Sequence, residues 1–155
     1  MNKSRTAVSI ALASTLFCLL ALAQEKTIQK AELPAAVQKT ADEQSKGATV
    51  KGYSSEVEDG KLTYEVQLIV NGHGRDVAID ANGVVIEIED EVEMVSLPAA
   101  VQDGLKKKAG EGKILRVESL TKKGKLVAYE AVVQTGTKKK EIQVGPDGKP
   151  LAHEE

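Results

Sequence analysis

Apolar and polar residues alternate with a period of two over several segments of this chain, a pattern typical of strands with one buried face. The clearest segment runs from Leu62 to Val70, where every even position is apolar and most odd positions are polar. Asn82-Gly83 and Asp147-Gly148 favour tight hairpin turns between such segments. Further strands are predicted around 77–79, 84–89, 129–133 and 142–144, with a last strand that starts at Lys149.

Two other segments carry apolar residues four positions apart, which predicts a helix with one buried stripe. A proline, Pro34 or Pro98, follows the leucine that opens each stripe, and proline is favoured in the first turn of a helix. Gly47 and Gly110 are suited to end the two helices. The stripes are formed by Leu33, Val37 and Ala41 in the first segment and by Leu97, Val101, Leu105 and Ala109 in the second.

The sequence contains an internal repeat with an offset of about 64 residues. The six residues from Leu33 to Gln38 recur without change from Leu97 to Gln102. Later matches keep the same order, including Gly60-Lys61-Leu62 with Gly124-Lys125-Leu126. A run of identities at one offset, followed by matches in order, indicates duplication of one structural unit.

These patterns together predict an α+β fold built from two tandem units. Each unit would be one helix followed by a four-stranded antiparallel sheet, with the helices packed on one sheet face. The first unit is expected to span residues 24–92 and the second residues 93–155. The acidic segment from Glu89 to Met94 is expected to be the linker between them.

The first 23 residues have the composition of a secretory signal peptide. Lys3 and Arg5 precede an uncharged apolar run, and Ala21-Leu22-Ala23 matches the small-x-small pattern that signal peptidase accepts. We predict cleavage after Ala23, which makes the mature protein periplasmic or secreted, with no membrane association after cleavage. An uncleaved membrane anchor is the alternative. Cys18 falls in this segment, so the mature chain would have no cysteine for a disulfide or a thiolate metal site.

The charge of the mature chain argues against one class of partner. Residues 24–155 carry a net charge of −4, and nucleic-acid binding needs a concentrated basic face. The distribution is uneven, because residues 24–92 carry −7 and residues 93–155 carry +3. The acidic first half leaves open an alternative function, a periplasmic protein that binds a small ligand or a cation.

The chain shows no constellation of residues that indicates an enzyme. The histidines, His73 and His153, fall in a predicted turn and near the C-terminus, where solvated side chains are expected. Asp80-x-Asn82-Gly83 is explained by a hairpin turn, because its glycine comes too early for a calcium-binding EF-hand loop. We therefore expect no catalytic residue, no metal site and no cofactor.

The chain resembles the PepSY-like domains, and among them the set described as β-lactamase-inhibitor-like. The matching motifs are Leu33-Pro34, Asp59-Gly60-Lys61, Tyr64-Glu65-Val66 and Val77-x-Ile79-Asp80-x-Asn82-Gly83, with Leu97-Pro98, Gly124-Lys125, Tyr129-Glu130 and Asp147-Gly148 in the second copy. The resemblance implies an exported, non-enzymatic protein. It also implies that the protein binds, and inhibits or regulates, an extracytoplasmic enzyme such as a peptidase or another hydrolase.

The sheet face that the helices leave open is the candidate surface for a protein partner. One helix covers only one face of a sheet, so the other face must be open or covered by a partner. The alternation of strand residues predicts which side chains that face presents. The candidate binding residues are Tyr53, Glu65, Gln67, Ile69, Glu130, Val132 and Gln134.

Overall fold

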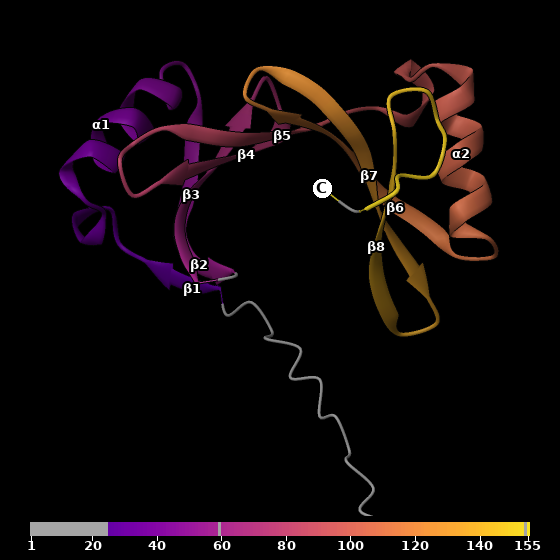
Figure 1. The fold of residues 1–155 in the computed structure, drawn as a ribbon, viewed down its shortest axis with the longest axis horizontal. Coiled ribbons are helices and arrows are strands. Elements are labelled where there is room, and N and C mark those ends of the chain that lie inside the picture. Colours follow the sequence, from indigo (N-terminus) through magenta and orange to yellow (C-terminus); the bar gives the residue numbers. More distant parts are fainter. Residues whose placement is uncertain (1–24, 59, 154) are drawn as a thin grey trace, which may run out of the picture.

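The structure is a computed structural model that describes residues 25–58, 60–153 and 155. The predicted signal peptide, residues 1–23, lies outside the described residues. The described strands form one antiparallel sheet in which each strand pairs with its neighbours in chain order (Figure 1). The strands are β1 (Lys26–Ile28), β2 (Thr49–Glu58), β3 (Lys61–Val70), β4 (His73–Asp80), β5 (Val85–Glu91), β6 (Lys113–Lys122), β7 (Lys125–Thr135) and β8 (Lys138–Val144).

The predicted fold of two tandem helix-plus-four-strand units is wrong, because the two halves share a single eight-stranded sheet. β5 pairs along β6, with Glu87 opposite Lys122 and Glu91 opposite Glu118. The segment expected to be a linker therefore begins inside β5. A strand that pairs on both edges leaves no break in the backbone hydrogen bonding, so the sheet continues from one half into the other.

The second half contributes three strands, since no strand forms after β8 in the described residues. The chain turns back there, and the Gly145 amide donates a hydrogen bond to the Lys149 carbonyl oxygen over 2.8 Å. Pro150 follows at once and has no amide hydrogen to offer a neighbouring strand. The last strand predicted from Lys149 is therefore replaced by a turn, and β8 is an edge of the sheet.

Both predicted helices are present, and they begin directly after Pro34 and Pro98. They are α1 (Ala35–Gln44) and α2 (Ala99–Ala109), each preceded by a short 3-10 helix, η1 (Lys30–Glu32) or η2 (Met94–Ser96). The two helices lie on the outer side of the curved sheet (Figure 1). No helix in the described part of the chain has the length and apolar character needed to cross a membrane.

Each helix covers its own apolar cluster, and the predicted stripes point into these clusters. Val37 and Val101 are both fully buried at 0% exposure. Both helices pack on the same face of the sheet, so the fold has two separate cores, one between each helix and the strands it covers. The cluster under α1 contains Ile28, Leu33, Val37, Ala41, Val66, Leu68, Val77 and Ile79, and that under α2 contains Leu97, Val101, Leu105, Ala109, Val117, Ala131, Val133, Ile142 and Val144.

Candidate functional site

The sheet face opposite α1 and α2 carries no helix among the described residues, and we call it the open face. Its side chains alternate along each strand with those that point into the two cores. Cross-strand partners lie on the same face, so the register identifies its members. Its polar and charged side chains include Ser54, Glu56, Thr63, Glu65, Gln67, Asp76, Glu87, Glu89, Glu91, Lys113, Arg116, Glu118, Lys122, Glu130, Gln134, Lys139, Glu141 and Gln143.

One acidic side chain from each of five consecutive strands crosses the middle of the open face. We call this set the acidic ladder: Glu65 on β3, Asp76 on β4, Glu89 on β5, Glu118 on β6 and Glu130 on β7. Asp76 lies directly opposite Glu89, and Glu118 lies directly opposite Glu130. Carboxylate oxygens of Asp76, Glu89 and Glu118 lie within 4.8 Å of one another. The ladder thus runs from the first half of the chain into the second.

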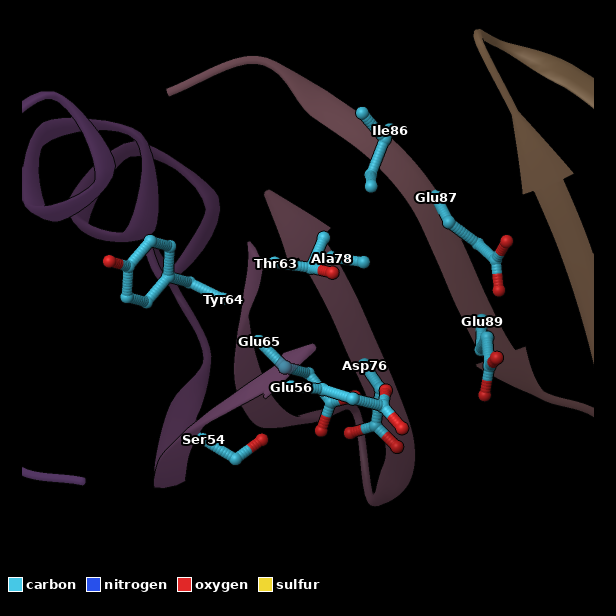
Figure 2. Close-up of a pocket in the computed structure, with 10 residues that line it drawn as sticks. All are labelled: Ser54, Glu56, Thr63, Tyr64, Glu65, Asp76, Ala78, Ile86, Glu87 and Glu89. Atoms are coloured by element: carbon cyan, nitrogen blue, oxygen red, sulfur yellow. The ribbon is translucent and has the colours of Figure 1, made fainter. Parts of the chain in front are cut away.

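The β3–β5 end of the ladder borders a hollow of about 160 Å³. Figure 2 shows the carboxylates of Glu56, Glu65 and Asp76 gathered on one side of the sheet, with Glu89 on the neighbouring strand. Tyr64 points away from them, toward α1, in agreement with its packing against the first core. The hollow is therefore lined mainly by acidic and hydroxyl groups rather than by aromatic rings.

Three members of the ladder each have one identified polar partner. The Gln67 side-chain amide donates to Glu65 over 2.9 Å, and the Gln143 amide donates to Glu130 over 2.8 Å. Arg116 forms an ion pair with Glu118 at 3.1 Å. Only one of these three contacts brings a positive charge, so the negative charge of the ladder is compensated incompletely.

An apolar floor lies beside the ladder on the same face. Leu120 is 1% exposed and Ala128 is 0% exposed, yet neither belongs to the core clusters under the helices. Leu120 is the direct cross-strand partner of both Glu89 and Ala128. A carboxylate held over such a surface loses part of its hydration, which disfavours its charged form.

Burial raises the pKa of every carboxyl group in the ladder, and it is the largest cause in each case. The pKa of Glu89 is raised to about 9 by burial together with the nearby Glu87 and Glu118 carboxylates. The pKa of Glu118 is raised to about 7, although Arg116 pulls it down. At neutral pH the ladder therefore holds protons that isolated carboxyl groups would have released.

The structure places six of the seven predicted binding residues on the open face. Glu65, Gln67 and Ile69 lie on β3, and Glu130, Val132 and Gln134 lie on β7. Three strands separate these two groups in the sheet, yet Glu65 and Glu130 line one hollow on the open face. The residues that connect them are Asp76, Glu89 and Glu118, which sequence reasoning did not select.

Tyr53 was predicted on the open face, and this placement is wrong. It pairs with Val66 and packs against the core under α1. The cause is an irregularity in β2, where Val50 pairs with Leu68 but Gly52 pairs with Gln67. The extra residue reverses the alternation from that point, so Tyr53 turns to the helix side.

Glu89 and Glu91 were missed because their acidity suggested a linker. In the structure Glu87, Glu89 and Glu91 share the open face, while Ile88 packs against the first core. The signal was present, because acidic residues at every second position are the pattern of a strand. Only the pairing with β6 shows that this strand is interior to the sheet.

The histidines and the hairpin aspartate that were considered for catalysis and metal binding are not members of the ladder. His73, the first residue of β4, and His153 near the C-terminus are both exposed. Asp80 accepts hydrogen bonds from the amides of Asn82 and Val84, each over 2.9 Å. These bonds lower the pKa of Asp80 and confirm its predicted role in a hairpin turn.

The fold and the open face together define a structural class, a curved antiparallel sheet with two helices outside and an acidic face inside. No protein-family model and no curated protein matches the chain significantly. Solved structures do match.

A BLIP-like protein from Bacteroides fragilis is 22% identical, with 77% of this chain and 83% of that chain covered and a TM-score of 0.56. A predicted periplasmic protein from Bacteroides eggerthii is 18% identical, with 77% and 86% covered and a TM-score of 0.61. A DUF2874 family protein from Bacteroides ovatus is 18% identical, with 77% and 84% covered and a TM-score of 0.58.

These similarities show that the chain has the fold of BLIP-like and DUF2874 family proteins. They do not support the narrower resemblance to PepSY-like domains. At this level of identity the fold is what is shared, and function has to be argued from the site.

Proposed function

We propose that this chain is an exported, non-enzymatic protein that binds a protein partner through the open face. The partner we propose is an extracytoplasmic peptidase or another hydrolase, which the bound protein inhibits or regulates. Cleavage after Ala23 and residence in the periplasm or outside the cell belong to the same proposal. The signal-peptide pattern supports export, and the predicted periplasmic location of the B. eggerthii protein agrees with it.

The observation that carries this proposal is the acidic ladder across a sheet face that no described helix covers. Glu65, Asp76 and Glu89 are partly exposed, whereas Glu118 and Glu130 are buried beneath the face. A concentration of one charge on a surface selects and orients partners. Of the six predicted residues on β3 and β7, Glu65 and Glu130 belong to the ladder, and the other four extend the proposed surface beyond it. The hydrolase class comes from the family resemblance.

Affinity capture with two matched variants tests the proposal. The ladder variant carries Glu65→Gln, Glu118→Gln and Glu130→Gln, and the helix-side variant carries Glu43→Gln, Asp103→Asn and Glu111→Gln. Each variant loses three acidic groups, but only the first changes the open face. Immobilised mature chains, residues 24–155, are exposed to the extracytoplasmic proteins of the host.

We expect the wild type and the helix-side variant to retain one hydrolase, and the ladder variant to retain about tenfold less of it. The purified hydrolase should lose activity when wild-type protein is added. Equal retention of the same proteins by all three baits would remove the open face from the proposal. Retention without any change in hydrolase activity would remove inhibition while leaving binding in place.

The alternative function, cation binding, has one arrangement in its favour, the close approach of Asp76, Glu89 and Glu118. Exposed acidic groups often lie together without an ion, so this cluster alone does not make it our leading proposal. A calcium titration distinguishes the two functions, because a ligand that binds the native state raises the melting temperature. A rise that is lost in the Glu118→Gln protein would favour cation binding.

A further inference from the structure

The sheet has two edge strands, β1 and β8, and β8 is the longer of them (Figure 1). We propose that the β8 edge binds an acidic, extended segment of another protein, which joins the sheet as one more strand. This inference goes beyond the proposed function, because it concerns an edge of the sheet and holds whether or not the open face binds a hydrolase. Neither the fold nor the similar structures assign a ligand to this edge.

Backbone hydrogen bonding is the first argument. β8 pairs with β7 on one side and has no strand neighbour on the other among the described residues. At the α2 end, Lys108 Nζ donates a hydrogen bond to the Gln143 carbonyl oxygen over 3.0 Å, and the Glu155 amide donates to the Gln143 side chain over 2.8 Å. The stretch that stays exposed is residues 138–141. Unpaired N–H and C=O groups along an edge strand are a template for an added strand.

The length of the two edges indicates which one is available. β1 has three residues and β8 has seven. A very short edge strand offers few backbone groups and is one of the ways in which proteins avoid strand addition. β8 is therefore the edge of the described sheet that can hold an extended segment.

Charge is the second argument, and it selects the kind of segment. Lys138, Lys139 and Lys140 are exposed, and none of them is paired with an acidic side chain in the part of the chain that the structure describes. Lys139 pairs with Gln134 and lies on the open face, so the other two lysines lie on the helix side. Opposite charges attract across neighbouring strands and like charges repel. Lysines on both faces therefore oppose a basic strand and favour an acidic one.

The same charges argue against a second copy of the chain as the occupant. The exposed part of β8 carries three lysines and one glutamate, so two such edges repel each other. β1, with the sequence Lys26-Thr27-Ile28, also offers a lysine and no acidic residue. The acidic strand that fits β8 is thus expected to come from a different protein.

A hollow of about 540 Å³ beside the edge is the third argument. Three of its lining residues belong to β8, so the hollow reaches the edge. Leu115 lines it from β6 and is 41% exposed, because it is an extra residue at an irregularity between Ile114 and Arg116. Val132 on β7 adds further apolar surface. The hollow suits one apolar side chain at the end of the acidic segment.

The experiment is a fluorescence titration with a synthetic peptide, capped at both ends, in which glutamate alternates with valine and one tryptophan ends the run. The chain has no tryptophan, so the signal comes from the peptide alone. Two variants of the mature chain are compared with the wild type. The edge variant carries Lys138→Gln, Lys139→Gln and Lys140→Gln, and the helix-lysine variant carries Lys39→Gln, Lys106→Gln and Lys107→Gln. Each loses three exposed positive charges, but only the first changes β8.

We expect the wild type and the helix-lysine variant to bind with Kd values within about twofold of each other, and the edge variant to bind about tenfold more weakly. The peptide with lysine in place of glutamate should not bind. The glutamate peptide with N-methyl groups on alternate residues keeps its charge but loses backbone donors, so it should also bind about tenfold more weakly. The bound glutamate peptide should slow hydrogen exchange of amides within residues 138–141.

Absence of binding by the glutamate peptide would overturn the inference. Equal binding by the edge variant would place the contact elsewhere, and equal binding of the N-methylated peptide would show charge attraction without strand pairing, so either result rejects the proposal. The N-methylated peptide is tested on the wild type, so this comparison does not depend on how well a variant folds. Dimers of the free wild type that are absent from the edge variant in analytical ultracentrifugation would assign the edge to a second copy instead.

Discussion

Replacement of Gly148 by alanine is expected to destabilise the protein by about 3–5 kcal/mol, enough to leave much of it unfolded. Gly148 has a φ of +77° in the turn after β8 and packs against the first turn of α2. A Cβ atom there would overlap the carbonyl group of Ala100 and lie 2.8 Å from the Val101 nitrogen. Backbone atoms inside a helix cannot move aside cheaply, so α2 would have to shift off its core.

The matched control is Gly124→Ala, at a turn with a nearly identical φ of +73° and no atom within 4 Å of the added Cβ. That substitution incurs only the backbone cost, about 1 kcal/mol. Urea unfolding followed by circular dichroism measures both proteins. If Gly148→Ala and Gly124→Ala lower the free energy of unfolding by similar amounts, the contact between the turn and α2 is looser than the structure indicates.

The same close contact between the turn and α2 predicts the effect of a substitution at Gly104, on the helix side of the contact. A Cβ on Gly104 of α2 would overlap the Gly148 carbonyl oxygen, so alanine there should be comparably harmful. In the first half, Gly83 makes the equivalent approach to α1, where an added Cβ would lie 2.7 Å from the Ala36 carbonyl oxygen. Thr40 Oγ1 also donates a hydrogen bond to the Gly83 carbonyl oxygen over 2.6 Å, so this turn and helix are held by both glycine packing and a hydrogen bond.

Replacement of Glu89 by glutamine is expected to stabilise the protein by about 1–3 kcal/mol at about pH 8, after allowance for solvent screening. The pKa of this carboxyl group rises from 4.5 to about 9 on folding. Below pH 4.5 both states hold the proton, so the group does not affect stability. Between pH 4.5 and about 9 the unfolded state releases it first, so the free energy of unfolding falls as pH rises.

Urea unfolding of wild type, Glu89→Gln and Glu43→Gln at about pH 5 and about pH 8 tests this. The wild type should be more stable at the lower pH, and Glu89→Gln should reduce that difference. Glu43 is exposed on α1, so its replacement should leave the pH dependence unchanged. A wild type that gains stability as pH rises would show that the ladder carboxyl groups are better solvated than their burial indicates.

The open-face residues that sequence reasoning selected were those within strongly alternating strands. Glu65 and Gln67 alternate with Val66 and Leu68 within one strand, so their common face could be predicted locally. The complete ladder could not be predicted from the sequence, because its members come from five strands and are brought together only by the cross-strand register. Asp76 and Glu89 are 13 residues apart in the sequence and directly opposite in the sheet.

The sequence by itself determined the elements whose signals are local. The stripes that begin at Leu33 and Leu97 specified the two helices, and Asn82-Gly83 specified a hairpin turn, because each depends on neighbouring residues only. Tertiary structure decided how these elements combine. The pairing of β5 with β6 joined the halves into one sheet, and the irregularity before Gly52 moved Tyr53 to the other face. The β5–β6 pairing and the irregularity in β2 both depend on hydrogen bonds between separate strands. The periodicity of residues along one strand does not specify which strand it pairs with.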